Sequence, residues 1–193
     1  TGTVDPLDTL AELAREAQCH YHVDAAWGGP TLFSRQHATI LKGIELADSV
    51  TIDAHKQLYT PMSSGLVLFK TPNTVAAIEH HAEYIIRKGS KDLGATSLEG
   101  SRSGAALLIH AGLHIIGRQG YELLIDQGIE KAQYFASLVN NDTDFELISK
   151  PELNILTYRL VPENVAEKLK YADNMQRQTI NEQLNRLTVL IQK

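Results

Sequence analysis

Short stretches of strand-like composition alternate with helical segments over the first 70 residues, and this alternation limits the possible folds more than any other feature. The strand candidates cover residues 20–25, 49–53 and 65–69. Leucines at helical spacing predict a helix over 7–17, and a second helical segment is predicted over 40–47. Strands alternating with helices favour a largely parallel, doubly wound α/β sheet. In such sheets the loops beyond the carboxyl ends of the strands carry ligands.

The later part of the chain predicts more helix and then a small α/β unit. Its predicted elements are a helical pattern after Pro72, a polar surface loop over 87–94, an apolar and therefore buried helix over 104–116, an amphipathic helix over 120–139, strands over 145–148 and 154–160, and a helix over 175–191. We place the domain change near Asn140. The predicted domains are thus a large domain, 1–140, and a small, truncated C-terminal domain, 141–193.

Composition excludes several classes of function. The chain has 193 residues and a net charge of -5, and its lysines and arginines are scattered, which disfavours nucleic acid as a partner and makes a small molecule the expected one. No stretch approaches the ~18 apolar residues that a membrane span needs. The single cysteine, Cys19, excludes a disulfide framework and fits a reducing cytoplasm. Both ends read as interior segments, so we expect the chain to be incomplete at both.

Two strand ends carry ionisable residues. Asp24 closes the first strand, and Asp53-Ala54-His55-Lys56 follows the second. A lysine that is buried or lies near a cation loses its proton more readily, which frees its amine to attack a carbonyl carbon. Taken singly, Asp24 reads as a structural loop residue and Lys56 as a surface lysine.

Taken together, the two clusters are much more specific. The segments 22–26 (His-Val-Asp-Ala-Ala) and 53–56 (Asp-Ala-His-Lys) resemble fold type I pyridoxal-phosphate enzymes, and among these the group II amino-acid decarboxylases. That group includes glutamate, aspartate and aromatic amino-acid decarboxylases. The segment 2–5 (Gly-Thr-Val-Asp) is similar to a Gly-small-x-Asp segment of the same enzymes, so the resemblance covers nearly the whole chain.

The resemblance implies roles for five residues. Lys56 would hold pyridoxal 5'-phosphate as a Schiff base, while Asp24 would pair with the pyridine nitrogen and keep the ring an electron sink. Ala26 would pack its methyl group against the ring. His55 and Asp53 stand where the family places His and Asn near the cofactor phosphate. Asp53 is a departure, because a carboxylate beside a phosphate is repulsive unless it is bridged or protonated.

The resemblance also assigns a mobile catalytic loop to residues 82–95. Tyr84 lies where the family's loop tyrosine donates a proton to Cα after carbon dioxide has left. A phenol suits this step, because it stays protonated at neutral pH with a reference pKa of about 10. The alternative is a core or interface tyrosine. Arg102 matches a Gly/Ser-Arg point after the loop, and its role is open.

The function implied is decarboxylation of an acidic L-amino acid, either aspartate to β-alanine or glutamate to 4-aminobutyrate, by a homodimer. One alternative is another pyridoxal-phosphate carbon–carbon lyase, since the enzymes that split sphingosine phosphate carry similar pairings. Residues 57–61 fit the decarboxylases better. A second alternative is a non-catalytic fragment, because the Gly/Ser phosphate cup of the family is not among these residues.

The remaining histidines do not predict a metal site. His20 and His22 alternate on a strand, and His110 and His114 are one helical turn apart. His20 and His22 have no carboxylate or cysteine partners at ligand spacing. His110 and His114 could form a metal pair, but we interpret them as core or interface residues.

Overall fold

The chain forms two compact units. The computed structural model describes residues 2–80, 89, 93–97 and 103–191. One unit consists of residues 5–125, and the other joins residues 1–4 to 126–193. The long helix α2 (Ala105–Asn141) contributes to both units. The domain change predicted near Asn140 falls at the end of this helix, and the division into domains 1–140 and 141–193 stays a prediction.

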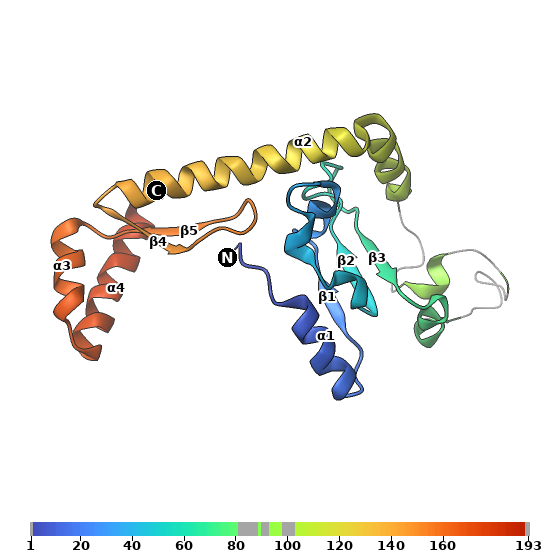
Figure 1. Cartoon of the computed structure of the whole chain (residues 1–193), viewed down its shortest axis with the longest axis horizontal. Coiled ribbons are helices and arrows are strands. Elements are labelled where there is room, and N and C mark those ends of the chain that lie inside the picture. The colour runs from blue at the N-terminus through green and yellow to red at the C-terminus, as the bar shows by residue number, and fades with distance from the viewer. Residues whose placement is uncertain (1, 81–88, 90–92, 98–102, 192–193) are drawn as a thin grey trace. The chain divides into compact units, whose positions relative to one another are not determined.

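A three-stranded sheet organises the first unit. It consists of β1 (His22–Asp24), β2 (Ser49–Ile52) and β3 (Leu66–Phe69), in that order (Figure 1). β1 and β2 run parallel, with Asp24 opposite Thr51, as the sequence predicts. β3 runs antiparallel to β2. The sheet is therefore mixed, and the expectation of a largely parallel sheet is correct only for its first pair.

The segments before β1 and between β1 and β2 are short. Helix α1 (Leu7–Glu16) has Asp8 in its first turn and Arg15 in its last, an arrangement that suits the helix dipole. The Tyr21 hydroxyl donates a hydrogen bond to the carbonyl of the buried Leu7, 3.0 Å away, and so fastens α1 to the start of β1. Three short 3-10 helices then lead to β2, namely η1 (Gly29–Phe33), η2 (Ala38–Leu41) and η3 (Ile44–Leu46). The helical segment predicted over 40–47 is thus two 3-10 turns.

The connection from β2 to β3 reverses the chain direction. A parallel strand would require a crossover connection, usually a helix, and the residues between β2 and β3 form no such helix. Instead the segment 53–65 folds back on itself around Ser64, which is 2% exposed. The Ser64 carbonyl accepts hydrogen bonds from the backbone N–H groups of Ala54 (3.1 Å) and His55 (3.3 Å), and its hydroxyl donates to the Pro61 carbonyl (2.8 Å). This compact turn explains why β3 returns antiparallel.

Tyr121 anchors the same turn from helix α2. Its side chain is fully buried, and its hydroxyl donates a hydrogen bond to the Leu58 carbonyl at 3.0 Å. Its ring stacks on that of Phe33, with ring centroids 5.3 Å apart. Burial raises the pKa of the Tyr121 phenol above the ordinary 10.0. One side chain thus connects α2, η1 and the turn that carries His55 and Lys56.

Helix α2 is interrupted at Gly117, whose backbone is not helical (φ 65°, ψ 172°). A positive φ of this size is accessible to glycine at little cost. The break separates the two helices predicted over 104–116 and 120–139, and both are confirmed. The expectation that the first is buried is wrong for the described residues, since Leu107 is 71% and Ile115 83% exposed. An apolar composition shows that these side chains favour burial. It does not show which part of a protein covers them.

The second unit is a small α/β unit. Strands β4 (Phe145–Ser149) and β5 (Thr157–Leu160) pair antiparallel, and helices α3 (Glu163–Tyr171) and α4 (Asn174–Ile191) follow them (Figure 1). The Phe135 ring of α2 meets the Tyr158 ring of β5 edge to face at 5.1 Å. The predicted strands and the last helix are confirmed, but helix α3 was not predicted from the sequence.

The N-terminal segment belongs to this second unit. The Gly2 carbonyl accepts hydrogen bonds from the backbone N–H groups of Glu152 (3.1 Å) and Leu153 (3.4 Å). Gly2 has a positive φ of 82°, and a Cβ there would lie 1.9 Å from the Ile155 carbonyl oxygen. Only glycine therefore fits this close approach.

None of the helices that the structure describes is both long enough and apolar enough to cross a membrane.

We predict that Tyr121→Phe lowers the free energy of unfolding of the complete protein by about 1–3 kcal/mol, because the buried Leu58 carbonyl loses its donor. The ring stack on Phe33 remains. Urea unfolding at neutral pH measures this loss. Because the pKa of Tyr121 is raised in the folded state, its contribution is full below pH 10.0 and declines as the pH rises above that value. The stability of the variant should therefore fall less steeply than that of the wild type above pH 10.

Tyr134→Phe is the matched control, because the Tyr134 side chain is 66% exposed. This change should alter the free energy of unfolding by less than about 0.5 kcal/mol. Equal effects of the two substitutions would contradict the anchoring role of Tyr121.

Candidate active site

Five of the predicted site residues gather at one edge of the three-stranded sheet. The carboxyl ends of the parallel strands β1 and β2 meet there, so Asp24 at the end of β1 lies beside the residues that follow β2. The Asp53 N–H donates to the Ala26 carbonyl at 3.1 Å and joins the two strand ends directly. Lys56 follows within the same turn, since its N–H donates to the Asp53 carbonyl at 3.1 Å.

Asp24 and Ala26 form a local turn. The Asp24 carboxylate oxygen Oδ1 accepts a hydrogen bond from the Ala26 N–H at 3.0 Å, which orients the carboxylate. Asp24 is exposed, and Ala26 is half-buried. The arrangement therefore presents a negative charge to solvent at the edge where α/β sheets bind ligands.

His55 is held by the turn around Ser64. Its ring nitrogen Nδ1 lies 3.1 Å from the Ser64 carbonyl oxygen. A carbonyl oxygen only accepts, so Nδ1 must carry the proton and donate. The other nitrogen, Nε2, then has a lone pair when the ring is neutral and becomes a donor only when the ring is charged. His55 is thus a fixed group that can offer a positive charge at this edge.

Lys56 forms an ion pair within its own turn. Its Nζ lies 2.7 Å from Oδ2 of Asp53, and the two side chains are 33% and 26% exposed. The sequence predicts Asp53 beside a cofactor phosphate, whereas in this structure the carboxylate contacts the lysine. The pair was not predicted, although the i, i+3 spacing within a turn is a signal that could have suggested it.

Two further predictions lie outside the described residues. Tyr84 and Arg102 both fall there, and of the predicted loop 82–95 the structure describes only residue 89 and residues 93–95. Their roles therefore stay predictions.

The histidines that the sequence disfavours as metal ligands contact other side chains. The His20 Nε2 and His22 Nδ1 atoms each lie 2.8 Å from the Ser49 hydroxyl, which is 4% exposed at the start of β2. His110 and His114 contact each other, with ring centroids 4.4 Å apart. Among the described residues, no group of three or more His, Cys, Asp or Glu side chains is placed to hold a metal ion.

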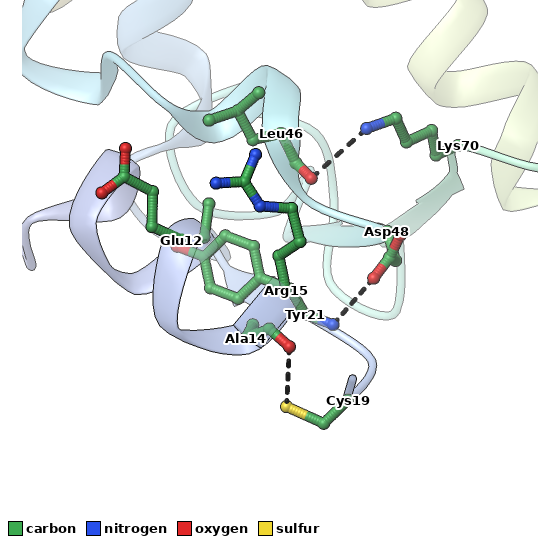
Figure 2. Close-up of a pocket in the computed structure, with 9 residues that line it drawn as sticks. Glu12, Ala14, Arg15, Cys19, Tyr21, Leu46, Asp48 and Lys70 are labelled. Atoms are coloured by element: carbon green, nitrogen blue, oxygen red, sulfur yellow. Dashed lines mark hydrogen bonds between the residues drawn. The ribbon is translucent and has the colours of Figure 1, made fainter. Parts of the chain in front are cut away.

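A pocket of about 400 Å³ lies at the opposite end of the sheet. Figure 2 shows Arg15 of α1, Tyr21 before β1 and Asp48 before β2 around it, with the Tyr21 N–H donating to the Asp48 carboxylate at 2.9 Å. Lys70, which follows the antiparallel β3, completes this side. The pocket faces the amino ends of the parallel strands and contains none of the predicted site residues. It is therefore separate from the edge that carries Asp24 and Lys56.

Comparison with known proteins points to one family. The family model for the pyridoxal-dependent decarboxylase conserved domain matches residues 1–161. The chain is 58% identical to aspartate 1-decarboxylase of Aliivibrio fischeri over 193 residues, all of this chain and 35% of that protein. It is 34% identical to L-2,4-diaminobutyrate decarboxylase of Rhizobium meliloti over 177 residues, 89% of this chain and 35% of that protein.

The fold agrees as well. The crystal structure of mouse CSAD in apo form superposes with a TM-score of 0.78 at 28% identity, covering 93% of this chain and 38% of that one. This confirms the predicted α/β fold class of the type I pyridoxal-phosphate enzymes. The chain spans about a third of the length of these curated relatives. It belongs to the family of pyridoxal-dependent decarboxylases.

Proposed function

We propose that the complete protein containing this chain removes the α-carboxylate of an acidic L-amino acid, with L-aspartate as the preferred substrate and β-alanine as the product. The observation that carries this proposal is the 58% identity, over all 193 residues, to aspartate 1-decarboxylase of Aliivibrio fischeri. Conversion of L-glutamate to 4-aminobutyrate is the other acidic reaction that the sequence resemblance implies.

The residues at the sheet edge fit pyridoxal 5'-phosphate. This cofactor has an aldehyde, a pyridine nitrogen and a phosphate, and the edge provides an amine (Lys56), a carboxylate (Asp24) and an imidazole (His55). When bound, the cofactor withdraws electrons from the substrate Cα, which makes loss of the carboxylate possible. The chemistry of this donor set supports the cofactor, apart from Asp53, whose charge opposes that of a phosphate.

The chain's own residues are proposed to bind and orient the cofactor. Asp24, held by the Ala26 N–H, is the residue proposed to accept a hydrogen bond from the protonated ring nitrogen. A negative partner there keeps the ring protonated and electron-withdrawing. Ala26 is proposed to pack against the ring. His55 is proposed to contact the phosphate through Nε2, because Nδ1 is already used by the Ser64 carbonyl.

Tyr84 is proposed to donate a proton to the substrate Cα after carbon dioxide has left. Its phenol would be protonated at neutral pH and become an acid when held close to a carbanionic carbon. The family resemblance of the segment 82–95 supports this role.

A second substrate is favoured by a specific observation. The 34% identity to L-2,4-diaminobutyrate decarboxylase of Rhizobium meliloti points to a substrate with a cationic side chain. The lower identity makes this the second candidate. Both relatives carry decarboxylase names, which supports carboxylate loss over another carbon–carbon cleavage.

We expect the complete protein to release carbon dioxide faster from L-aspartate than from L-glutamate, L-2,4-diaminobutyrate or aromatic L-amino acids. A panel assay of these substrates measures this order.

Lys56→Ala should remove the visible absorbance of bound cofactor and lower turnover on the order of a thousandfold, because the covalent anchor is lost. Lys168→Ala, at an exposed position of helix α3, is the matched control and should keep both. An alanine variant at Lys56 with full absorbance would contradict the assignment.

We also expect Tyr84→Phe to keep cofactor absorbance while it lowers amine production about 100-fold or more, because a proton donor is removed and the ring is kept. Product quantification under saturating substrate checks this result. Tyr171→Phe, at a side chain that is 89% exposed, should leave turnover unchanged. Unaltered amine production in the Tyr84 variant would argue for the core or interface alternative.

We propose further that the complete protein is a cytoplasmic homodimer. The family resemblance supports the dimer, and the single Cys19 fits a reducing compartment. Light scattering should give twice the subunit mass, and fractionation of the source cells should place the protein with the cytoplasmic enzymes. A monomeric mass at micromolar concentration, or recovery from another fraction, would contradict the respective part of the proposal.

A further inference from the structure

The pocket at the amino ends of the parallel strands has charged side chains from several elements on its wall. Helix α1 contributes Glu12 and Arg15, while Asp48 precedes β2 and Lys70 follows β3 (Figure 2). Its volume of about 400 Å³ lies at the small end of the range of ligand sites, about 300–1,000 Å³. The pocket therefore has the size of a site for a small molecule.

Backbone hydrogen bonds fix the frame of this pocket. The Asp48 N–H donates to the Tyr21 carbonyl at 2.8 Å, and the Lys70 N–H donates to the Asp48 carbonyl at 2.9 Å. The Tyr21 N–H donates to the carboxylate oxygen Oδ2 of the half-buried Asp48 at 2.9 Å. The carboxylate is thus held in one orientation, and within the described part of the chain its other oxygen, Oδ1, has no hydrogen-bond partner.

Two cationic side chains in the pocket lack a carboxylate partner among the described residues. The Arg15 guanidinium forms neither a hydrogen bond nor an ion pair with any of them. The Lys70 Nζ contacts only the neutral Leu46 carbonyl, at 3.4 Å. Figure 2 shows that the Arg15 and Lys70 side chains both extend toward Leu46. Both positive charges are therefore available to a negative group of a ligand.

A paired cation in the same unit gives the contrast. The Lys42 Nζ lies 3.2 Å from Oδ2 of Asp8, although both side chains are largely exposed. Arg15 forms no such pair, even though Glu12 lies three positions before it on the same helix, a spacing that suits an ion pair. Glu12 and Arg15 thus both keep their charges free toward the pocket.

The charges on the wall favour a ligand that carries both signs. The wall has two cations, Arg15 and Lys70, and two carboxylates, Glu12 and Asp48, so their charges cancel. A simple anion would face both carboxylates and a simple cation both positive groups, and like charges at short range repel. A zwitterion can meet an opposite charge at each of its ends.

The apolar part of the wall limits the rest of the ligand. The apolar side chains that line the pocket are few, namely Ala11, Ala14, Leu46 and the ring of Tyr21. Apolar ligand groups gain free energy only where apolar surface covers them. The pocket therefore favours a zwitterion without a large apolar side chain.

We propose that this pocket binds a small free amino acid and is a second ligand site, apart from the proposed active site. The ligand carboxylate is held by Lys70 and by Arg15, whose guanidinium can donate two parallel hydrogen bonds. The ligand ammonium group donates to Oδ1 of Asp48, and Glu12 adds a second negative charge to the wall. The inference goes beyond the proposed function and does not depend on it, because it uses residues at the opposite end of the sheet.

Cys19 reports on occupancy, because it is exposed and lines the same pocket. The complete protein is treated with iodoacetamide, with and without saturating β-alanine, at matched ionic strength, and alkylation of Cys19 is followed by peptide mass spectrometry. We expect β-alanine, which has one carboxylate and one ammonium group, to slow alkylation about threefold or more by covering the thiol. Succinate and ethylammonium each carry one sign of charge and should slow it less than about 1.5-fold.

Two substitutions assign the protection to the pocket. Arg15→Gln removes the guanidinium, and Asp48→Asn removes the negative charge but keeps an oxygen that can accept the Tyr21 N–H. Each should abolish the protection of Cys19 by β-alanine. Lys42→Gln is the matched control, because Lys42 is a 77% exposed cation of the same unit that does not line the pocket, and it should keep the protection.

Four results would overturn the proposal. They are equal alkylation with and without β-alanine, equal protection by succinate, protection that survives in Arg15→Gln or Asp48→Asn, and a Cys19 that resists alkylation in the native complete protein. The second result would indicate a site for anions, and the last would mean that another part of the protein fills the pocket. Because the readout is local to Cys19, it can fail while the proposed decarboxylation stands, and the reverse also holds.

Discussion

The parallel pairing of β1 with β2 is the constraint on which the site depends. Two parallel strands end at the same edge of a sheet, so residues about 30 positions apart in sequence become neighbours there. Here the pairing places Asp24 opposite Thr51, and the Asp53 N–H extends the contact to the Ala26 carbonyl. A register shift of one residue would turn these side chains to the other face. The charges at the edge therefore depend on a backbone register, and not on any single contact between them.

The turn after β2 adds a second constraint. Because the Ser64 carbonyl closes it through hydrogen bonds to Ala54 and His55 and β3 returns antiparallel, Lys56 lies on a hydrogen-bonded segment. A lysine has a long, flexible side chain that can lose much rotamer entropy when it is held. The turn fixes the backbone of Lys56, and Tyr121 stabilises the turn from α2 by contacting the Leu58 carbonyl. The Lys56 side chain is thus carried by a segment that residues not touching its amine hold in place.

The sequence was sufficient for most of the elements and for placing the candidate site residues at two neighbouring strand ends. Periodicity located the helices over 7–17 and 120–139, and the two clusters pointed to Asp24 and Lys56 because their residue types follow consecutive strands. The sequence did not predict the features that depend on tertiary contacts. The antiparallel β3 follows from the compact turn, whose hydrogen bonds to Ser64 have no sequence pattern of their own. Tyr121 resembles any other tyrosine on an amphipathic helix, and its role depends on the burial of its hydroxyl.

The exposed apolar side chains in the first part of α2 have a different explanation from the antiparallel direction of β3. Apolar side chains such as Leu107 and Ile115 were expected to be buried, and the described residues leave them exposed. Their apolar character favours a buried environment, which the described residues do not provide. The relatives are about three times longer than this chain, so additional chain is one source of such cover in those proteins.

The same comparison explains how the chemistry is distributed along the chain. The proposed cofactor contacts Asp24, Ala26, His55 and Lys56 lie within 33 consecutive residues at one sheet edge. The family implies the cofactor, and an amine, a carboxylate and an imidazole placed by two strands match its functional groups. Selection of a substrate side chain requires charged or apolar groups farther from the amine. The described residues hold the first set of groups together, which is why they indicate the reaction type more strongly than the amino acid that undergoes it.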